Sequence, residues 1–321
     1  MENIYYRMKL NFFLVVLVCL LFSGFNLLHA QKKLNVEVAF KELNDYVNVR
    51  DVAVSSDQKE VYFTIQSAFN EIAQIAYMTH SEGKWSSPEL MDFSGRYSDL
   101  EPFLSPDQKT LYFASNRPLD GTSTEVKDYD IWCVKRSDIA SPWGQPINLG
   151  HPVNTKNDEF YPSTSINNNL YYTMDAASGM GKDDIYFSAY KDGTYSAPQL
   201  LDSNVNSDGF EFNAFISRNE DFILFTKYNS EGGIGSGDLY ISRREAGGNW
   251  ARSENLGTII NTTFMEYCPF YDQDNEILYF TSRRNTIKAQ KFASAKDLTS
   301  YLMEGENGLS KIYKVKIKLH N

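Results

Sequence analysis

Residues 104–117 read Leu-Ser-Pro-Asp-Gln-Lys-Thr-Leu-Tyr-Phe-Ala-Ser-Asn-Arg, and Asp130-Ile131-Trp132 follow after a polar loop. A polar turn at 105–109 separates two short apolar stretches. Asp and Pro in such a turn favour a tight connection between antiparallel strands. A third apolar stretch begins at Asp130. The segment therefore predicts three consecutive strands of an antiparallel sheet.

The apolar strand after the turn recurs along the chain. Its anchor residues lie 50, 59, 53 and 55 residues apart, and they are Val61, Leu111, Leu170, Ile223 and Leu278. A fourth short strand follows in most repeats, as at 143–149, where Pro146 suits an outermost strand because its missing N–H faces solvent. Such four-stranded units pack radially as the blades of a propeller. The sequence predicts an all-β fold, a single five-bladed β-propeller with four-stranded antiparallel blades.

The last repeat lacks a fourth strand, and the N-terminal region has a spare one. We expect residues 34–40 to be the outer strand of the last blade, so that the N-terminal strand closes the ring and removes the exposed sheet edges. The propeller domain is expected over residues 31–321, with blades at 46–91, 97–150, 154–202, 206–257 and 261–317.

Two local features follow from this register. Ser294-Ala295-Lys296-Asp297 predicts a helix start, and Leu298, Tyr301 and Leu302 then share one face, so we expect a helix over one end of the ring. Cys133 and Cys268 fall in blades two and five. We therefore expect two buried free thiols.

The N-terminus has the pattern of an exported protein. Arg7 and Lys9 precede an apolar run at 12–22, and Leu28-His29-Ala30 ends the segment, which predicts a signal peptide over residues 1–30. The run is too short for a membrane span, and no later stretch approaches the required length. Location is expected to be periplasmic or secreted, with the periplasm favoured.

The composition of the chain limits the classes of partner and ligand that it is expected to bind. Removing Arg7, Lys9 and Glu2 with the signal peptide changes the net charge from −10 to −11. An acidic surface disfavours nucleic acid and anionic lipid. Only three widely separated histidines remain after cleavage, so a transition-metal site is not expected. We expect a monomer without a cofactor.

Residues 104–117 with Asp130-Ile131-Trp132, and the later Trp143-Gly144-Gln145-Pro146-Ile147-Asn148-Leu149, resemble the PD40 repeat (WD40-like, TolB-like) of Bacteroidetes envelope propellers. The resemblance covers nearly all of residues 34–317 and is weakest in blade one, where Gln74 stands in place of the usual Asp. It implies binding and scaffolding in the cell envelope, with an envelope protein or a glycan as partner.

Four acids occupy equivalent positions at the start of the innermost strand, and they are Asp99, Glu159, Glu211 and Glu266. They are expected around one mouth of the central channel. They would hold a hard cation such as calcium or the hydroxyls of a sugar, or they would accept backbone N–H groups of the inter-blade loops. We expect the second role.

Other side chains have a binding and a structural interpretation. Basic residues follow the second strand, and they are Arg117, Arg283 and Arg284, with Lys227 in blade four. They would grip a carboxylate-bearing ligand or pair with neighbouring acids such as Asp120, and we favour pairing. Trp85, Trp143 and Trp250 would form a sugar platform or pack between blades, and we favour packing.

Catalysis has little support in the sequence. There is no Gly-x-Ser-x-Gly elbow, and no catalytic residue is assigned. A glycosidase needs two carboxylates roughly 5 to 9.5 Å apart, whereas the four acids repeat with the blades. We predict an exported, non-catalytic binding or scaffolding propeller. The alternative is a carbohydrate-active hydrolase or lyase, which asymmetric acids in the channel would favour.

Overall fold

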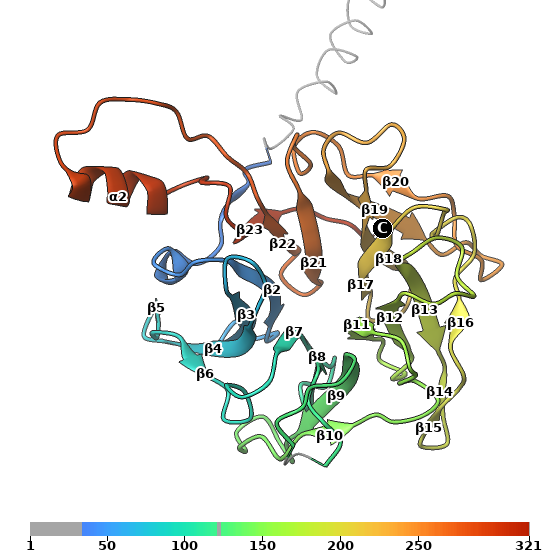
Figure 1. Ribbon diagram of the computed structural model, residues 1–321. Coiled ribbons are helices and arrows are strands. Elements are labelled where there is room, and N and C mark those ends of the chain that lie inside the picture. The colour runs from blue at the N-terminus through green and yellow to red at the C-terminus, as the bar shows by residue number, and fades with distance from the viewer. Residues whose placement is uncertain (1–33, 121–122, 321) are drawn as a thin grey trace, which may run out of the picture. The chain divides into compact units, whose positions relative to one another are not determined.

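The computed structural model describes residues 34–120 and 123–320, and residues 36–321 belong to one compact unit. In that unit five antiparallel sheets of four main strands surround a central axis (Figure 1). This confirms the five-bladed propeller. The expected signal peptide lies outside the described residues. No helix in the described part of the chain is long and apolar enough to span a membrane.

Each blade runs from an inner to an outer strand. The innermost strands are β2 (Val49–Val54), β7 (Asp99–Leu104), β11 (Glu159–Thr164), β17 (Glu211–Ile216) and β21 (Glu266–Asp272). The second strands are β3 (Glu60–Gln66), β8 (Thr110–Ser115), β12 (Leu170–Met174), β18 (Phe222–Tyr228) and β22 (Ile277–Ser282). The third strands are β4 (Ala73–Ser81), β9 (Asp130–Lys135), β13 (Asp184–Ser188), β19 (Gly237–Arg243) and β23 (Lys311–Lys316).

The outer strands are short. They are β6 (Glu89–Leu90), β10 (Ile147–Asn148), β16 (Gln199–Leu200), β20 (Glu254–Asn255) and β1 (Glu37–Val38). Two small additions extend the blades: β5 (Lys84–Trp85) pairs with β4, and β14 (Tyr190–Lys191) pairs with β15 (Thr194–Tyr195).

The N-terminal strand closes the ring. Glu37 and Val38 of β1 pair with Lys314 and Tyr313 of β23, so the first strand of the described chain completes the last blade. Phe40 follows and is buried, with its ring 6.0 Å from Tyr279 of blade five and 5.4 Å from Trp85 of blade one. The closure therefore joins the first and last blades by hydrogen bonds and by aromatic packing.

The polar turns between the first and second strands have a common geometry. The backbone N–H of Gln108 donates to the Ser105 carbonyl at 2.8 Å, and the Ser105 hydroxyl donates to Asp107. Gln108 has φ of 60°, in the left-handed region. The same turn position is left-handed at Gln58, Asn168 and Glu220, and in blade five the left-handed residue is Glu276, one position later in its turn. The turns thus lie at the polar runs from which they were predicted.

The tryptophans pack between blades. The Trp143 indole N–H donates to the Tyr62 hydroxyl of the preceding blade at 3.2 Å, and the two rings meet edge to face. The rings of Trp250 and Tyr171 of blade three also meet edge to face. The structural interpretation of these residues is thus the one that the contacts support. Cys133 and Cys268 are both free and buried, as expected from their separate blades.

The predicted helix is present as α2 (Ala295–Met303), and the Ser294 hydroxyl caps it by accepting from the Asp297 backbone N–H. The expectation that it covers one end of the ring is wrong. None of its residues is buried, and Figure 1 shows it beyond the outline of the ring. Tyr301 instead contacts Phe292 of the same insertion, because that loop is long enough to pack on itself.

Candidate functional site

The four equivalent acids begin the innermost strands, as expected, but their side chains are only 0 to 1% exposed. Each accepts a hydrogen bond from a hydroxyl of the loop that precedes it, and the donors are Ser94, Thr155, Ser207 and Thr262. In three blades the backbone N–H of the same residue donates as well, as from Ser207 to Glu211 at 2.8 Å. These contacts fix the inter-blade loops rather than leave the carboxylates open to a ligand.

Three of the acids also have a cationic partner within their own blade. Arg117 contacts Asp99 at 2.6 Å, Lys227 contacts Glu211 at 3.5 Å, and Arg284 contacts Glu266 at 3.3 Å. Glu159 has no ion pair in the described part of the chain. Since each acid bonds within its own blade and the loop before it, no hydrogen bond or ion pair among described residues joins one acid of the set to another.

Burial changes the ionisation of two of these acids. It raises the pKa of Asp99, although Arg117 opposes the shift. It raises the pKa of Glu159 to about 7, because no cation compensates and Asp130 and Asp128 add negative charge nearby. The blades are therefore equivalent in backbone but different in charge.

The two arginine candidates have different surroundings. Arg117 is 6% exposed, donates to Asp99, and lies 5.2 Å from the Phe113 ring, so it is committed to the interior. Arg284, the neighbour of Arg283, occupies the same position in blade five and donates to Glu266. Arg283 itself is exposed. The structure therefore does not bring Arg117 and Arg283 together.

The residues at the centre of the channel were not predicted from the sequence. Every innermost strand has a register shift two residues after its start, and the residue there has φ between 49° and 62°. These residues are Asp51, Glu101, Tyr161, Asn213 and Cys268. A bulge redirects side chains, and here it directs unlike groups to the axis. The residue type at this position differs in every blade, but neighbouring positions of the strand vary as well, so the sequence offered no signal that singles it out.

Arg50 links the two central carboxylates. Its Nε donates to Asp51 Oδ1 at 2.8 Å, and its Nη2 donates to Glu101 Oε1 at 2.7 Å. The other oxygens are also used, because the backbone N–H of Glu101 donates to Asp51 Oδ2 and that of Tyr161 donates to Glu101 Oε2. All four carboxylate oxygens therefore have donors.

The central cluster is buried. Asp51 is 0% exposed and Glu101 is 4% exposed. Burial raises the pKa of Glu101 to about 7, opposed by the charge of Arg50. The Cys268 thiol accepts from Arg50 at 3.4 Å and donates to Asn213 at 3.3 Å, and burial holds its pKa well above the usual range. The cluster thus occupies the interior of the ring, where Arg50 keeps the most exposure, 14% of its side chain.

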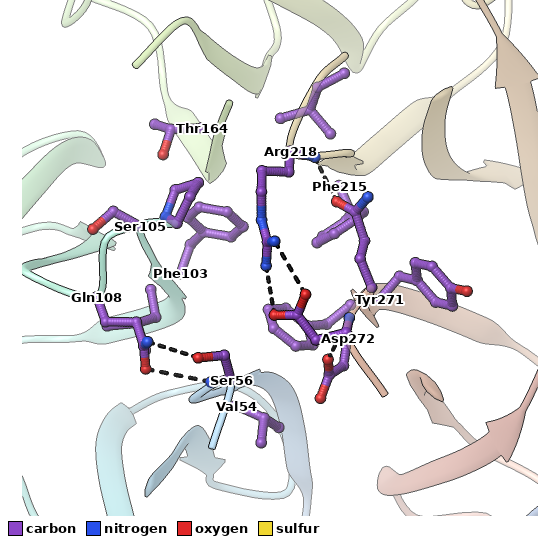
Figure 2. Close-up of a pocket in the computed structure, with 16 residues that line it drawn as sticks. Val54, Ser56, Phe103, Ser105, Gln108, Thr164, Phe215, Arg218, Tyr271 and Asp272 are labelled. Atoms are coloured by element: carbon purple, nitrogen blue, oxygen red, sulfur yellow. Dashed lines mark hydrogen bonds and ion pairs between the residues drawn. The ribbon is translucent and has the colours of Figure 1, made fainter. Parts of the chain in front are cut away.

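The hairpin turns surround the opposite mouth, where a pocket of about 60 Å³ lies (Figure 2). Its apolar lining includes Phe103, Phe215 and Phe270, which come from blades two, four and five. Phe215 meets Phe103 at 6.3 Å and Phe270 at 5.5 Å between ring centres. Such a volume holds a few waters or the tip of an apolar side chain.

Two polar contacts cross the rim of this pocket. Arg218 donates to both oxygens of Asp274 at 3.1 and 2.7 Å, which joins blades four and five. Gln108 exchanges hydrogen bonds with Ser56 of blade one. Figure 2 shows the Arg218 side chain extending into the middle of the mouth. The polar groups of the rim are thus paired with one another.

The comparisons with known proteins bear on the fold alone. No protein-family model matches the sequence, and neither does any curated protein. An endo-arabinase from Bacteroides thetaiotaomicron has 14% identity and a TM-score of 0.53, over 87% of this chain and 97% of that one. An α-L-arabinofuranosidase from Podospora anserina, in complex with cellotriose, has 10% identity and a TM-score of 0.51, over 87% and 93%.

TolB from Acinetobacter baumannii has 12% identity and a TM-score of 0.46, over 84% of this chain and 54% of that one. The chain thus matches about half the length of that protein. At this level of similarity, the likeness to TolB carries no argument about function.

Proposed function

We propose that the chain is an exported, non-catalytic propeller that serves as a binding or scaffolding module in the cell envelope. The observation that carries the proposal is the saturation of the central carboxylates. A glycosidase acid must donate a proton to the leaving oxygen, and its partner must reach the sugar or a water molecule. Asp51 and Glu101 are buried, and each oxygen already accepts a hydrogen bond.

The rest of the channel supports the same proposal. The four acids at the start of the innermost strands are occupied by loop donors and cations, and the opposite mouth has an aromatic lining. With its central carboxylates already bonded, the ring offers its loop surfaces to a partner. The pattern of residues 1–30 supports export, and the acidic surface supports an envelope protein or glycan as partner. We propose that it acts as a monomer.

One observation favours a second candidate, a carbohydrate-active hydrolase or lyase. The central acids break the repeat, because blades one and two supply Asp51 and Glu101 where the other blades supply Tyr161, Asn213 and Cys268. The raised pKa of Glu101, about 7, is also the kind of shift that a general acid needs. For this candidate, Arg50 would have to release both carboxylates when a sugar enters.

Activity assays separate the two candidates. The purified protein is incubated with aryl glycosides, arabinan and polyuronates, and release of phenol, reducing ends or unsaturated sugar is measured. We expect no product above buffer, and no difference between the native protein and the Glu101→Gln variant. Turnover that is lost in both Glu101→Gln and Asp51→Asn, with melting temperatures unchanged, would overturn the proposal.

Export has its own test. The full chain is expressed in a bacterial host, and the periplasmic fraction is analysed by mass spectrometry. The mature protein is expected to begin at Gln31. A cytoplasmic protein that keeps its first residues would contradict the envelope location, without affecting the argument against catalysis.

A further inference from the structure

A second pocket lies between blades four and five. It has a volume of about 340 Å³, and its lining consists of Tyr228, Ser236, Thr263, Phe264, Met265, Arg283, Asn285 and Gly308. The strands that frame it, β18, β19, β21 and β22, are neighbours in the ring (Figure 1). The lining contains one cation and no acid, in a chain with a net charge of −10.

Arg283 is the charged group of this pocket, and it is held in place without being neutralised. Its Nε donates to the Ser310 hydroxyl at 3.3 Å, and its guanidinium carbon lies 5.6 Å from the centre of the Tyr267 ring. Among the described residues it forms no ion pair, and neither terminal nitrogen has an acceptor. A guanidinium whose stem is fixed and whose outer edge is open is suited to bind a carboxylate through two hydrogen bonds.

The neighbouring arginine shows what a structural role looks like here. Arg284 is 8% exposed, donates to Glu266 and to the Ile260 carbonyl, and lies against the Tyr313 ring at 5.0 Å. Arg283 has none of these acidic or backbone partners. Of the two adjacent arginines, Arg284 is therefore buried and paired, whereas the guanidinium of Arg283 faces the pocket.

The walls of the pocket are fixed by close backbone contacts. The Ser236 backbone N–H donates to the Phe264 carbonyl at 3.1 Å, and the Arg283 backbone N–H donates to the Met265 carbonyl at 2.9 Å. Gly235 approaches the loop so closely that a Cβ there would clash with the carbonyl oxygens of Thr262 and Phe264. The pocket is thus formed before any ligand arrives, which lowers the ordering cost of binding.

The other lining residues indicate which groups a ligand would need in addition to its negative charge. Phe264 and Tyr228 are each 37% exposed and offer aromatic surface. The side chains of Ser236 and Thr263 have no hydrogen-bond partner among the described residues, so they remain available to polar groups. The pocket volume is at the lower end of the range for small-molecule sites.

We propose that this pocket binds a small organic carboxylate with an apolar face, and that Arg283 is the group that recognises the carboxylate. The inference deepens the proposed function, since it supplies a binding module with a ligand site. A peptide C-terminus with an apolar side chain and an acidic sugar with its apolar ring face share this chemistry. The experiment therefore includes both sources.

Calorimetric titration of the full mature protein tests the proposal with matched pairs of probes. The acids are hydrocinnamate, acetyl-leucine and galacturonate, and their neutral counterparts are hydrocinnamyl alcohol, acetyl-leucinamide and galactose. We expect at least one acid to bind at millimolar concentration and at least tenfold more tightly than its neutral partner, since bonds to charged groups contribute most. Acetyl-leucine as the preferred acid indicates a peptide end, and galacturonate indicates an acidic glycan.

Variants assign the site. Arg283→Gln is expected to weaken binding of that acid at least tenfold, and Arg283→Lys to have an intermediate effect because the planar fork is lost. Arg252→Gln removes the same charge from an exposed position outside the pocket and should change affinity less than twofold. Phe264→Ala should weaken hydrocinnamate and leave the fold intact, which melting temperatures would verify.

Equal binding of acid and neutral probes would overturn the proposal, and so would an Arg283→Gln variant that melts normally and binds normally. Absence of binding by all three acids would also overturn it. None of these outcomes involves turnover, so the failure of this inference is distinguishable from the failure of the proposed function.

Discussion

Glu159 differs from the other acids of its set because it lacks a cationic partner among the described residues. Its pKa is raised from an ordinary 4.5 to about 7 by burial, so the folded protein holds the proton more tightly than the unfolded chain does. The proton then stabilises the fold at low pH, and this contribution is lost as the pH rises through about 7.

Replacing Glu159 with Gln should therefore help at high pH. Between about pH 5 and pH 8, the unfolding free energy of Glu159→Gln relative to the native protein should rise by about 2 kcal/mol. Denaturant unfolding at the two pH values measures the change. Glu245→Gln, at an exposed position, is the control and should show no such trend. A flat difference for Glu159→Gln would mean that Glu159 is ionised in the fold at little cost.

A second residue prediction concerns the asparagines that connect blades. Asn206 is fully buried, accepts from the Ile185 backbone N–H at 2.8 Å and donates to the Ile185 carbonyl at 3.0 Å. Asn154 and Asn261 make the same pair of bonds to Ile131 and Leu239. In these three inter-blade loops, the amide side chain thus acts as a bridge to the third strand of the blade before it.

Asn206→Ala should destabilise the protein by about 1–3 kcal/mol, because it leaves the buried Ile185 N–H without an acceptor. Chemical denaturation gives the value. Asn167→Ala, in an exposed turn, should change stability by less than about 0.5 kcal/mol. Equal effects for the two variants would show that the bridge contributes nothing beyond an ordinary surface amide.

At the scale of elements, closure of the ring depends on the short strand β1. Strand β1 has two residues, yet it covers the edge of β23 and is followed by the buried Phe40. An uncovered edge invites pairing with another molecule, and loss of a buried aromatic ring leaves a cavity.

Removal of residues 34–40 should therefore lower the melting temperature and promote aggregation, and Phe40→Ala alone should cost about 3–5 kcal/mol. Calorimetry and light scattering of the mature protein give both readouts. Glu37→Gln, which removes only an exposed ion pair with Lys314, should melt like the native chain. A truncated protein that melts normally would show that the ring closes without this strand.

For the whole molecule, the four equivalent acids of blades two to five lead to a prediction about cation binding. Asp99, Glu159, Glu211 and Glu266 are closed off by loop donors, and three of them have cationic partners. We therefore expect millimolar calcium to leave the melting temperature unchanged. A site filled at a hundred times its dissociation constant would add about 2.7 kcal/mol. A rise that disappears in Glu211→Gln and Glu266→Gln would contradict the structural role.

The sequence alone determined the number of blades, their order and the closure by the N-terminal strand. These follow from local rules, because a short apolar strand and a turn of Asp, Asn and Pro residues are specified within a dozen or so positions. The start of α2 at Ser294 followed in the same way from its capping pattern. The position of that helix could not be predicted, since it depends on whether a surface of the folded ring packs against the helix, and none of its residues is buried.

Only the tertiary structure decided which side chains meet at the axis. Arg50 and Asp51 are neighbours in the sequence, but Glu101 and Cys268 lie 51 and 218 positions from Arg50, and a bulge in each innermost strand brings these residues together. It also decided that Arg283 is open while Arg284 is paired, a difference between two adjacent residues of the same type. Local sequence specifies strands and turns. Which side chains contact each other depends on five strands converging on one axis.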